Sequence, residues 1–289
     1  VVIRTLNEVK YLEELLMAIE AQELPGAGYE VIVVDSGSSD GTLKIAERHG
    51  CRILHITRED FSFGRSLNVG CEAAEGDVLV IISGHCVPAD EHWLQKLCQP
   101  LFDEQADYSF GRQLGGEQSN YSEKRIFAKY YPARGLNGQT DFFCNNANAA
   151  IPYTQWQRFR FDEDITGLED MELARRLVQA DGKVQYVPEA GVYHYHNESW
   201  AQVQRRFERE AIALQQIMPQ VHIGLRDVVR YVVTSVFKDW QSAFGEGVWR
   251  QFALEILRYR WHQYFGAYIG NNEHRRLSYA DREKYFFPE

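Results

Sequence analysis

The chain has 289 residues, of which 45% are hydrophobic and 25% charged, so it is long enough and apolar enough to bury a large core. Its formal net charge of −10 argues against a nucleic-acid partner, because binding to phosphates requires a basic face. Its five cysteines show no C-x-x-C spacing, which argues against a zinc ribbon or a disulfide framework and indicates reduced thiols in a cytoplasmic protein.

The first part of the chain alternates buried strands with helices. A helical face follows the first strand, a turn-rich segment opens a second helix, and a third helix is expected near residues 66–75. The predicted strands are VVI at residue 1, EVIVVD at 30–35, RILHI at 52–56 and DVLVII at 77–82. Continuous apolar strands that alternate with helices predict an α/β fold with a mostly parallel sheet and helices on both faces.

The middle of the chain is less regular. Residues 142–151 alternate loosely between polar and apolar side chains, and residues 167–182 predict a helix that ends at glycine. The inner face of that helix is expected to carry Met171, Ala174 and Val178. Two short strands, VQYVP and GVYHYH, are predicted to follow.

The last part of the chain predicts two amphipathic helices. Apolar residues run at helical spacing from Leu225 to Trp240 and again from Trp249 to Phe265. The favoured interpretation is that both helices pack on the preceding domain or on a second subunit in a homodimer. The alternative is peripheral contact with an anionic membrane, because Arg250, Arg258 and Arg260 lie beside the second stripe. No apolar run reaches the ~20 residues that a spanning helix needs.

Asp35 ends the second predicted strand and is followed by the glycine- and serine-rich loop 36–42. Ligands of such sheets bind beyond the carboxyl ends of the strands, where a carboxylate can accept hydrogen bonds from a ribose or a base. The alternative is an ordinary strand-to-helix turn with a helix cap. A P-loop is excluded, because the chain has no G-x-x-x-x-G-K-[ST] motif.

Histidines occur at two further candidate positions. Ser83, Gly84 and His85 follow the fourth strand, and an imidazole there can bind a divalent metal or donate to a diphosphate. His194 and His196 alternate, which predicts both on one face of a strand. A structural role for each histidine is the alternative.

Glu169 and Asp170 fall in the first turn of a predicted helix. Two carboxylates there are explained by their favourable interaction with the positive end of the helix dipole. The functional alternative is a general base that points into a cleft.

The order of these clusters resembles that of family 2 glycosyltransferases with the GT-A fold, particularly a bacterial rhamnosyltransferase-like branch. The resemblance covers residues 1–215 as a catalytic domain and leaves 216–289 as a helical extension. The matching blocks are RTLNE, EVIVVDSGSSDGT, FSFGRSLNVG, AEGDVLVIISGHCVP, GRQL, YYP at 130–132, FFCNNANAAI, GLEDMELARRL and VPEAGVYHYH.

The resemblance implies an inverting transfer of a sugar from a nucleoside-diphosphate donor to an acceptor hydroxyl in surface polysaccharide synthesis. It implies that Asp170 is the catalytic base, paired with Glu169. The residues implied in nucleotide binding are Thr5, Asn7, Asp35, Ser36, Arg65, Ser83 and Gly84.

The same resemblance places His194 near the metal and the diphosphate. His85 stands at the second aspartate of the family's D-x-D motif and Ser83 at the first. Imidazole suits Mn²⁺ better than Mg²⁺, so two alternatives stay open. Either His85 and His194 bind a divalent ion, which is favoured, or cations such as His85 and Arg65 neutralise the diphosphate directly.

Other functions remain as alternatives at this point. The loss of D-x-D is compatible with a non-catalytic nucleotide-sugar-binding module, and Asp35, His85, His194 and His196 are compatible with a metal hydrolase. The branch resemblance suggests dTDP-rhamnose as donor, although UDP- and GDP-linked sugars fit equally. The implied acceptor is a glycan or a lipid-linked saccharide.

Overall fold

The computed structural model describes residues 1–135, 141–273 and 285–286, which divide into two compact units. Unit 1 contains residues 1–114, 130–164 and 169–195, apart from the undescribed 136–140. Unit 2 contains residues 115–129, 165–168 and the described residues from His196 onward. These units follow packing, and the expected catalytic boundary at residue 215 stays a prediction.

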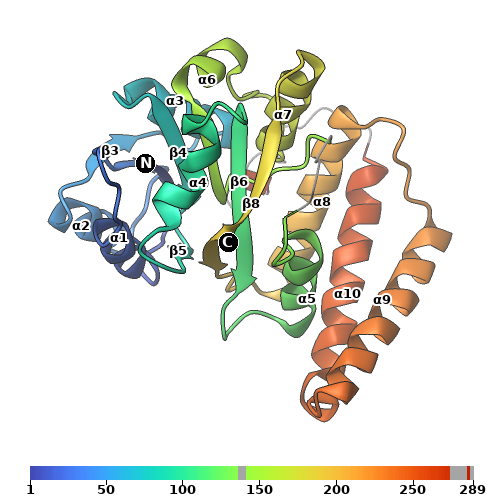
Figure 1. The fold of residues 1–289 in the computed structure, drawn as a ribbon. Coiled ribbons are helices and arrows are strands. Elements are labelled where there is room, and N and C mark those ends of the chain that lie inside the picture. Colours follow the sequence, from blue (N-terminus) through green and yellow to red (C-terminus); the bar gives the residue numbers. More distant parts are fainter. Residues whose placement is uncertain (136–140, 274–284, 287–289) are drawn as a thin grey trace. The chain divides into compact units, whose positions relative to one another are not determined.

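Unit 1 is built on an eight-stranded sheet with the order β3-β2-β1-β4-β7-β6-β8-β5. Figure 1 labels β3, β4, β5, β6 and β8 of this sheet. The pairs β3-β2, β2-β1 and β1-β4 are parallel, as the sequence predicts, whereas β4-β7, β7-β6 and β8-β5 are antiparallel. Strands β6 and β8 include charged residues among their apolar ones, namely Arg112 in β6 and Glu189 in β8. Such mixed polarity is typical of antiparallel strands. The strands are β1 Val2–Thr5, β2 Ile32–Asp35, β3 Arg52–His55, β4 Val78–Ser83, β5 Cys86–Pro88, β6 Tyr108–Gly115, β7 Asn148–Pro152 and β8 Val184–His194.

Helices cover both faces of the parallel strands, because successive side chains of a strand point to opposite faces. Val2 and Val34 face α3, where a side chain at Gly70 would lie within 2.8 Å of both. Ile3 and Val33 belong instead to the core formed with α1 and α4. The helices of unit 1 are α1 Leu12–Glu20, α2 Thr42–Arg48, α3 Phe63–Ala73, α4 Trp93–Phe102, α6 Tyr153–Phe159 and α7 Glu169–Gln179.

Two details differ from the prediction. The segments VQYVP and GVYHYH form one strand, β8, which ends at His194, so His196 lies beyond the strand. Pro188 does not interrupt β8. The fully buried face of α7 is formed by Leu173, Ala174 and Leu177 together with its acidic first turn, whereas Met171 and Val178 are half-buried.

Unit 2 is helical, with α5 Tyr121–Tyr130, α8 Trp200–Ile217, α9 Leu225–Gly245 and α10 Trp249–Asn271. A capping box at Ser199 and Gln202 starts α8. Gly266 and Gly270 bring α10 against the backbone of α8. Both predicted terminal helices are present, and no helix in the described ranges combines the length and apolar character needed to cross a bilayer.

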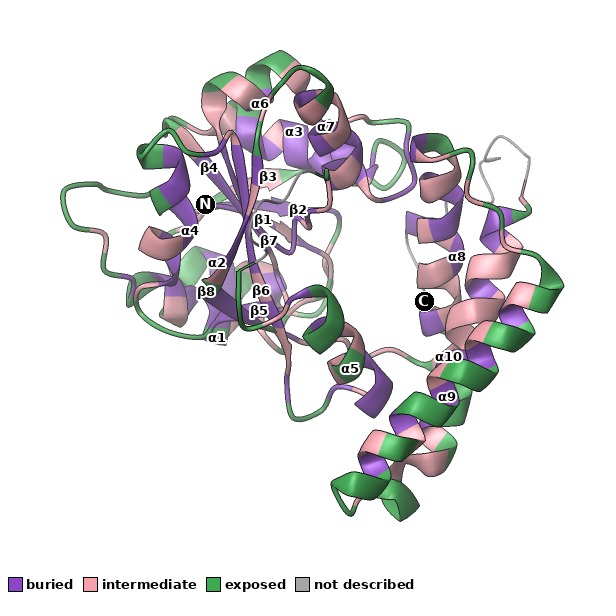
Figure 2. Cartoon of the chain, turned by 45° about the vertical axis from the view of Figure 1, so that its right-hand side comes forward, coloured by how far each residue is buried: buried purple, intermediate pink, exposed green. Residues whose placement is uncertain are grey.

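Only part of the predicted apolar stripe of α9 is buried (Figure 2). Val228, Val232 and Val236 pack in the core of unit 2 with Ile256 of α10. The neighbouring apolar residues of the stripe are exposed.

Candidate active site

The carboxyl ends of β1, β2 and β4 meet at one edge of the sheet. Thr5 is in register with Asp35, and Arg4 is in register with Ser83. The strand order reverses here, because β2 and β3 lie on one side of β1 and β4 lies on the other. This is the position at which α/β sheets bind ligands.

Asp35 is buried and organises the loop that follows β2. Its Oδ2 accepts hydrogen bonds from the backbone N–H groups of Gly37 (2.9 Å) and Ser38 (3.0 Å), and its Oδ1 accepts from the Thr5 hydroxyl (3.2 Å). The Ser36 hydroxyl donates to the Thr5 carbonyl, 3.1 Å away. The exposed Asn7 accepts from the Ser39 N–H (2.9 Å), so the predicted nucleotide-binding residues of β1 and β2 do lie together.

Gly84 is required by the close approach of the chain after β4 to β1. A Cβ atom at residue 84 would lie 3.0 Å from the Arg4 carbonyl oxygen and 2.9 Å from Cγ of Glu8. The absence of a side chain therefore allows the backbone of the Ser83-Gly84-His85 turn to lie against the end of β1.

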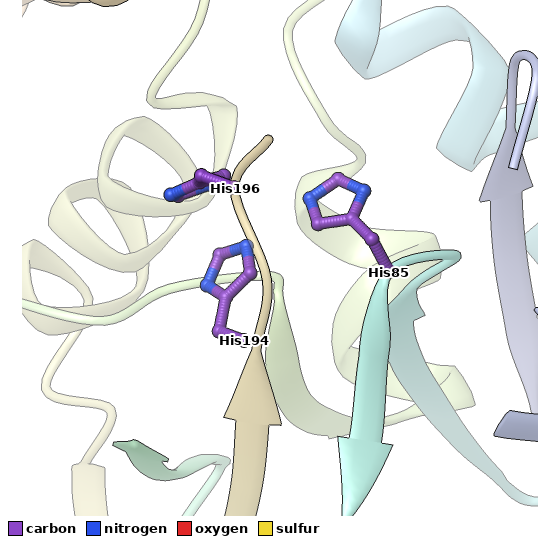
Figure 3. A group of neighbouring side chains, drawn as sticks. All are labelled: His85, His194 and His196. Atoms are coloured by element: carbon purple, nitrogen blue, oxygen red, sulfur yellow. The ribbon is translucent and has the colours of Figure 1, made fainter. Parts of the chain in front are cut away.

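His85 and His194 are neighbours because β5 and β8 pair, with Cys86 opposite His194. Their rings stack with centroids 5.0 Å apart and an interplanar angle of 22°, and a ring nitrogen of one lies within 4.8 Å of a ring nitrogen of the other (Figure 3). Two residues along the chain from His194, His196 belongs to unit 2, where its Nδ1 lies 2.7 Å from Oε1 of Glu123.

Hydrogen bonds orient the imidazoles of His85 and His194. Nδ1 of His85 lies 2.7 Å from Oε1 of Glu8, and Nδ1 of His194 lies 2.7 Å from Oε1 of Gln113. Carboxylate and amide oxygens only accept hydrogen bonds, so in the neutral imidazole each Nδ1 carries the proton and each Nε2 has the lone pair. This is the tautomer in which a histidine binds a metal through Nε2, with its ring held by an outer partner.

Asp170 is buried at the start of α7 and is tied to the same edge of the sheet. Its Oδ2 accepts from the backbone N–H of Asn146 and its Oδ1 from that of Met171, both at 2.7 Å. The next residue after Asn146, Ala147, accepts a hydrogen bond from the N–H of Ser83 (3.4 Å). The carboxylate of Asp170 is thereby held close to the end of β4.

Burial and then the negative charge of Glu169 raise the pKa of Asp170 to about 7. The backbone N–H groups of Asn146 and Met171 and the charge of Arg4 lower this pKa. Arg4 also forms an ion pair with Glu169, with Nη1 3.0 Å from Oε1. The raised pKa brings the titration of Asp170 near neutral pH, which is what a general base requires.

Arg65 is exposed on α3, and its Nη2 lies 3.6 Å from Oδ1 of Asp60. Its expected role in neutralising the diphosphate stays a prediction.

Four residues that hold the site together have no assigned role in the sequence analysis: Arg4, Glu8, Gln113 and Asn146. All four fall inside the motif blocks RTLNE, GRQL and FFCNNANAAI. Asn146 also accepts a hydrogen bond from the hydroxyl of Tyr108 at 2.5 Å, and its Nδ2 is buried without a hydrogen-bond partner among the described residues. Their position within these motif blocks was the only sequence signal that could have predicted a role for these four residues.

Comparison with known proteins identifies the family. The model of the family described as "Glycosyl transferase family 2" matches residues 1–166, more than half of the chain. Among curated proteins, the O-antigen chain rhamnosyltransferase RfbN of Salmonella typhimurium is 28% identical over 208 residues, which are 68% of this chain and 66% of that protein. The O-antigen chain rhamnosyltransferase WbaN of Salmonella anatum is 27% identical over 58% of this chain and 57% of that protein. The matched part thus covers less than two thirds of each relative.

Solved structures give the fold. A mannosyltransferase from Pyrobaculum calidifontis, determined with GDP-Man and Mn²⁺, superposes with a TM-score of 0.63 at 18% identity, over 93% of this chain and 83% of that one. TarS residues 1–349 from S. aureus, in complex with UDP, superposes with a TM-score of 0.53 at 14% identity, over 95% of this chain and 92% of that one. The predicted GT-A fold is therefore confirmed.

Proposed function

The chain belongs to glycosyl transferase family 2, and we propose that it is an inverting enzyme that moves a sugar from a nucleoside-diphosphate sugar to an acceptor hydroxyl. The observation that supports this proposal is the buried Asp170, whose raised pKa and backbone hydrogen bonds favour a base at the strand edge that also holds Asp35 and Ser83. We assign the nucleoside to Asp35, Thr5, Ser36 and Asn7, and the diphosphate to Ser83 and Gly84.

The reaction is a single in-line displacement. Asp170 takes the proton of the acceptor hydroxyl while that oxygen bonds to the anomeric carbon. The bond from this carbon to the diphosphate oxygen breaks on the opposite face, and its electron pair leaves with the nucleoside diphosphate. The configuration at the carbon is thereby inverted. Proton abstraction by a positioned base contributes roughly 10²- to 10⁴-fold to the rate. The ion pair with Arg4 engages Glu169, which leaves Asp170 as the group that exchanges a proton.

A divalent ion fits the pair His85 and His194. In its neutral form each ring can offer an Nε2 lone pair, and imidazole suits Mn²⁺ better than Mg²⁺. A bound ion would neutralise the charge that develops on the leaving diphosphate. Glu8 and Gln113 hold the two rings in place for it.

The sugar is proposed from the relatives. Two of them carry the name O-antigen chain rhamnosyltransferase, which supports a deoxyhexose such as rhamnose from a dTDP-linked donor and an acceptor that is a growing glycan or a lipid-linked saccharide. We place this reaction in the synthesis of a bacterial surface polysaccharide, in the cytoplasm or at the inner face of the cytoplasmic membrane.

The proposal is tested by Asp170→Asn. We expect the rate of sugar transfer, or of donor hydrolysis, to fall by about 10²- to 10⁴-fold with donor affinity nearly unchanged, because the amide cannot accept the proton at neutral pH. Product formation and calorimetric titration of the donor measure the two quantities. Asp181→Asn, an exposed change just beyond the other end of α7, is the matched control and should leave both unchanged. Full turnover by Asp170→Asn would reject the base, and tight donor binding by the unaltered protein without any turnover would instead indicate a binding module.

The metal proposal has its own test. We expect Mn²⁺ to increase the affinity for a nucleoside diphosphate and the double variant His85→Ala and His194→Ala to lose this increase. Calorimetric titration of UDP or dTDP with and without Mn²⁺ measures it in the absence of turnover. Equal nucleotide affinity with Mn²⁺ and with a chelator would mean that cationic side chains, without a metal ion, neutralise the diphosphate.

A further inference from the structure

An exposed apolar row runs along α9 in unit 2. The row consists of Leu225, Val229, Val233 and Phe237, which are four residues apart and therefore lie on one strip of the helix. Each side chain is between 57% and 66% exposed. Single exposed apolar residues are ordinary, whereas a continuous row is typical of an interaction surface.

The row is distinct from the part of α9 that stabilises unit 2. Val228, Val232 and Val236 fill the core, and each precedes a member of the row by one residue, about 100° around the helix. The row extends over roughly 18 Å along the helix axis. On α10, Leu254 and Trp261 are also exposed, and Phe265 stacks on Trp261 at 5.3 Å.

The net charge of α9 and α10 is positive, whereas that of the whole chain is negative. Residues 225–271 carry six arginines and lysines and four acidic residues, a net charge of +2 in a chain of −10. Two of the acidic groups are engaged within unit 2, since Asp239 pairs with Arg260 at 2.8 Å and Glu255 accepts from the Tyr121 N–H at 2.6 Å. The exposed basic residues of the two helices are Arg226, Arg230, Lys238, Arg250 and Arg258.

We propose that α9 lies flat on an anionic lipid surface, with the apolar row in the acyl boundary and the basic residues at the headgroups. An exposed helix with an apolar strip and flanking arginines has the properties of an interfacial helix. A second copy of the chain fits the row less well, because a symmetric contact through α9 would bring the basic flanks of both copies together. This proposal does not depend on the proposed reaction.

Vesicle flotation tests the proposal. We expect the full chain to float with vesicles of phosphatidylethanolamine and phosphatidylglycerol and to remain behind with phosphatidylcholine. The row variant, Val229→Ser with Val233→Ser and Phe237→Ser, should lose binding. The charge variant, Arg226→Glu with Lys238→Glu, should weaken it by about tenfold or more, because each basic residue near such a surface contributes substantially.

The control changes one exposed apolar and one exposed basic residue of unit 1, Met17→Ser and Lys44→Glu, and should bind as the unaltered chain does. Unchanged melting temperatures and nucleotide affinities would separate this result from misfolding and from failure of the proposed reaction. Absence of binding by the unaltered chain, equal binding to phosphatidylcholine, or full binding by the row variant would overturn the proposal. A lipid-free dimer that the row variant dissociates would assign the row to a second copy.

Discussion

As the proposed general base, Asp170 is subject to two opposing demands. A general base must be ionised at the working pH, yet burial and the adjacent Glu169 disfavour the charged form and raise its pKa to about 7. The N–H groups of Asn146 and Met171 stabilise the carboxylate and limit this rise. The balance makes the group basic enough to take a proton from a hydroxyl and still ionised in a large fraction of molecules near neutral pH.

This balance predicts the pH dependence of the reaction. We expect kcat/KM to fall about tenfold per pH unit below about 7, because only the ionised form of Asp170 accepts the proton. Initial rates between pH 5 and 9 measure this. If kcat/KM stays constant down to pH 5, Asp170 with its raised pKa is not the catalytic base.

The raised pKa of Asp170 also affects the stability of the folded chain. This stability falls as the pH rises, whereas the activity is expected to increase. The folded chain binds a proton at Asp170 up to about pH 7, whereas an unfolded carboxyl releases it near its usual value of about 4. The contribution of this residue to stability is therefore fully present below about pH 4 and is lost as the pH rises through about 7. The unfolding free energy of Asp170→Asn should accordingly exceed that of the unaltered chain by more at pH 8 than at pH 5.

At the scale of elements, the periodicity of apolar residues predicted the parallel strands and both terminal helices. It did not predict that residues 184–194 form one strand or that α9 buries only part of its stripe, because hydrophobicity does not reveal which neighbour covers a given face. The paired carboxylates at α7 and the histidine after β4 were visible as candidates. Their partners Arg4, Glu8 and Gln113 were not, since these contacts depend on the register of strands far apart in the sequence.

The contact between α8 and α10 depends on glycine. A Cβ at Gly270 would lie 2.0 Å from the Glu208 carbonyl oxygen, so α10 would have to move away from α8. We expect Gly270→Ala to lower the unfolding free energy of unit 2 by roughly 1–3 kcal/mol. Gly245→Ala, at the end of α9 with no atom within 4 Å, is the control and should leave stability unchanged or raise it by up to about 1 kcal/mol. Urea unfolding monitored by circular dichroism compares them, and equal stability of the two variants would contradict the close packing.

At the scale of the whole molecule, the division into units separates the proposed chemistry from the proposed membrane surface. Every residue assigned here to nucleotide, metal or base belongs to unit 1, and the α9 row belongs to unit 2. All five cysteines also belong to unit 1, where four are buried and Cys51 is half-buried. Burial raises the pKa of Cys51 to about 11 and that of Cys98 to about 12, so neither is a reactive thiolate in the folded chain.

These thiols therefore report the unfolding of unit 1 and the effect of a ligand on it. We expect iodoacetamide at pH 8 to label the buried cysteines only as urea unfolds unit 1. A nucleoside diphosphate at about 100 times its dissociation constant stabilises the folded state by about 2.7 kcal/mol, which should raise the labelling midpoint by on the order of 1 M urea. Mass spectrometry of the labelled peptides measures the midpoint, and Asp35→Asn should reduce the increase because that carboxylate is assigned to the nucleoside. A midpoint that dTDP, UDP and GDP all leave unchanged, with or without Mn²⁺, would contradict a nucleotide site in unit 1, because any ligand bound to the folded state alone must raise it.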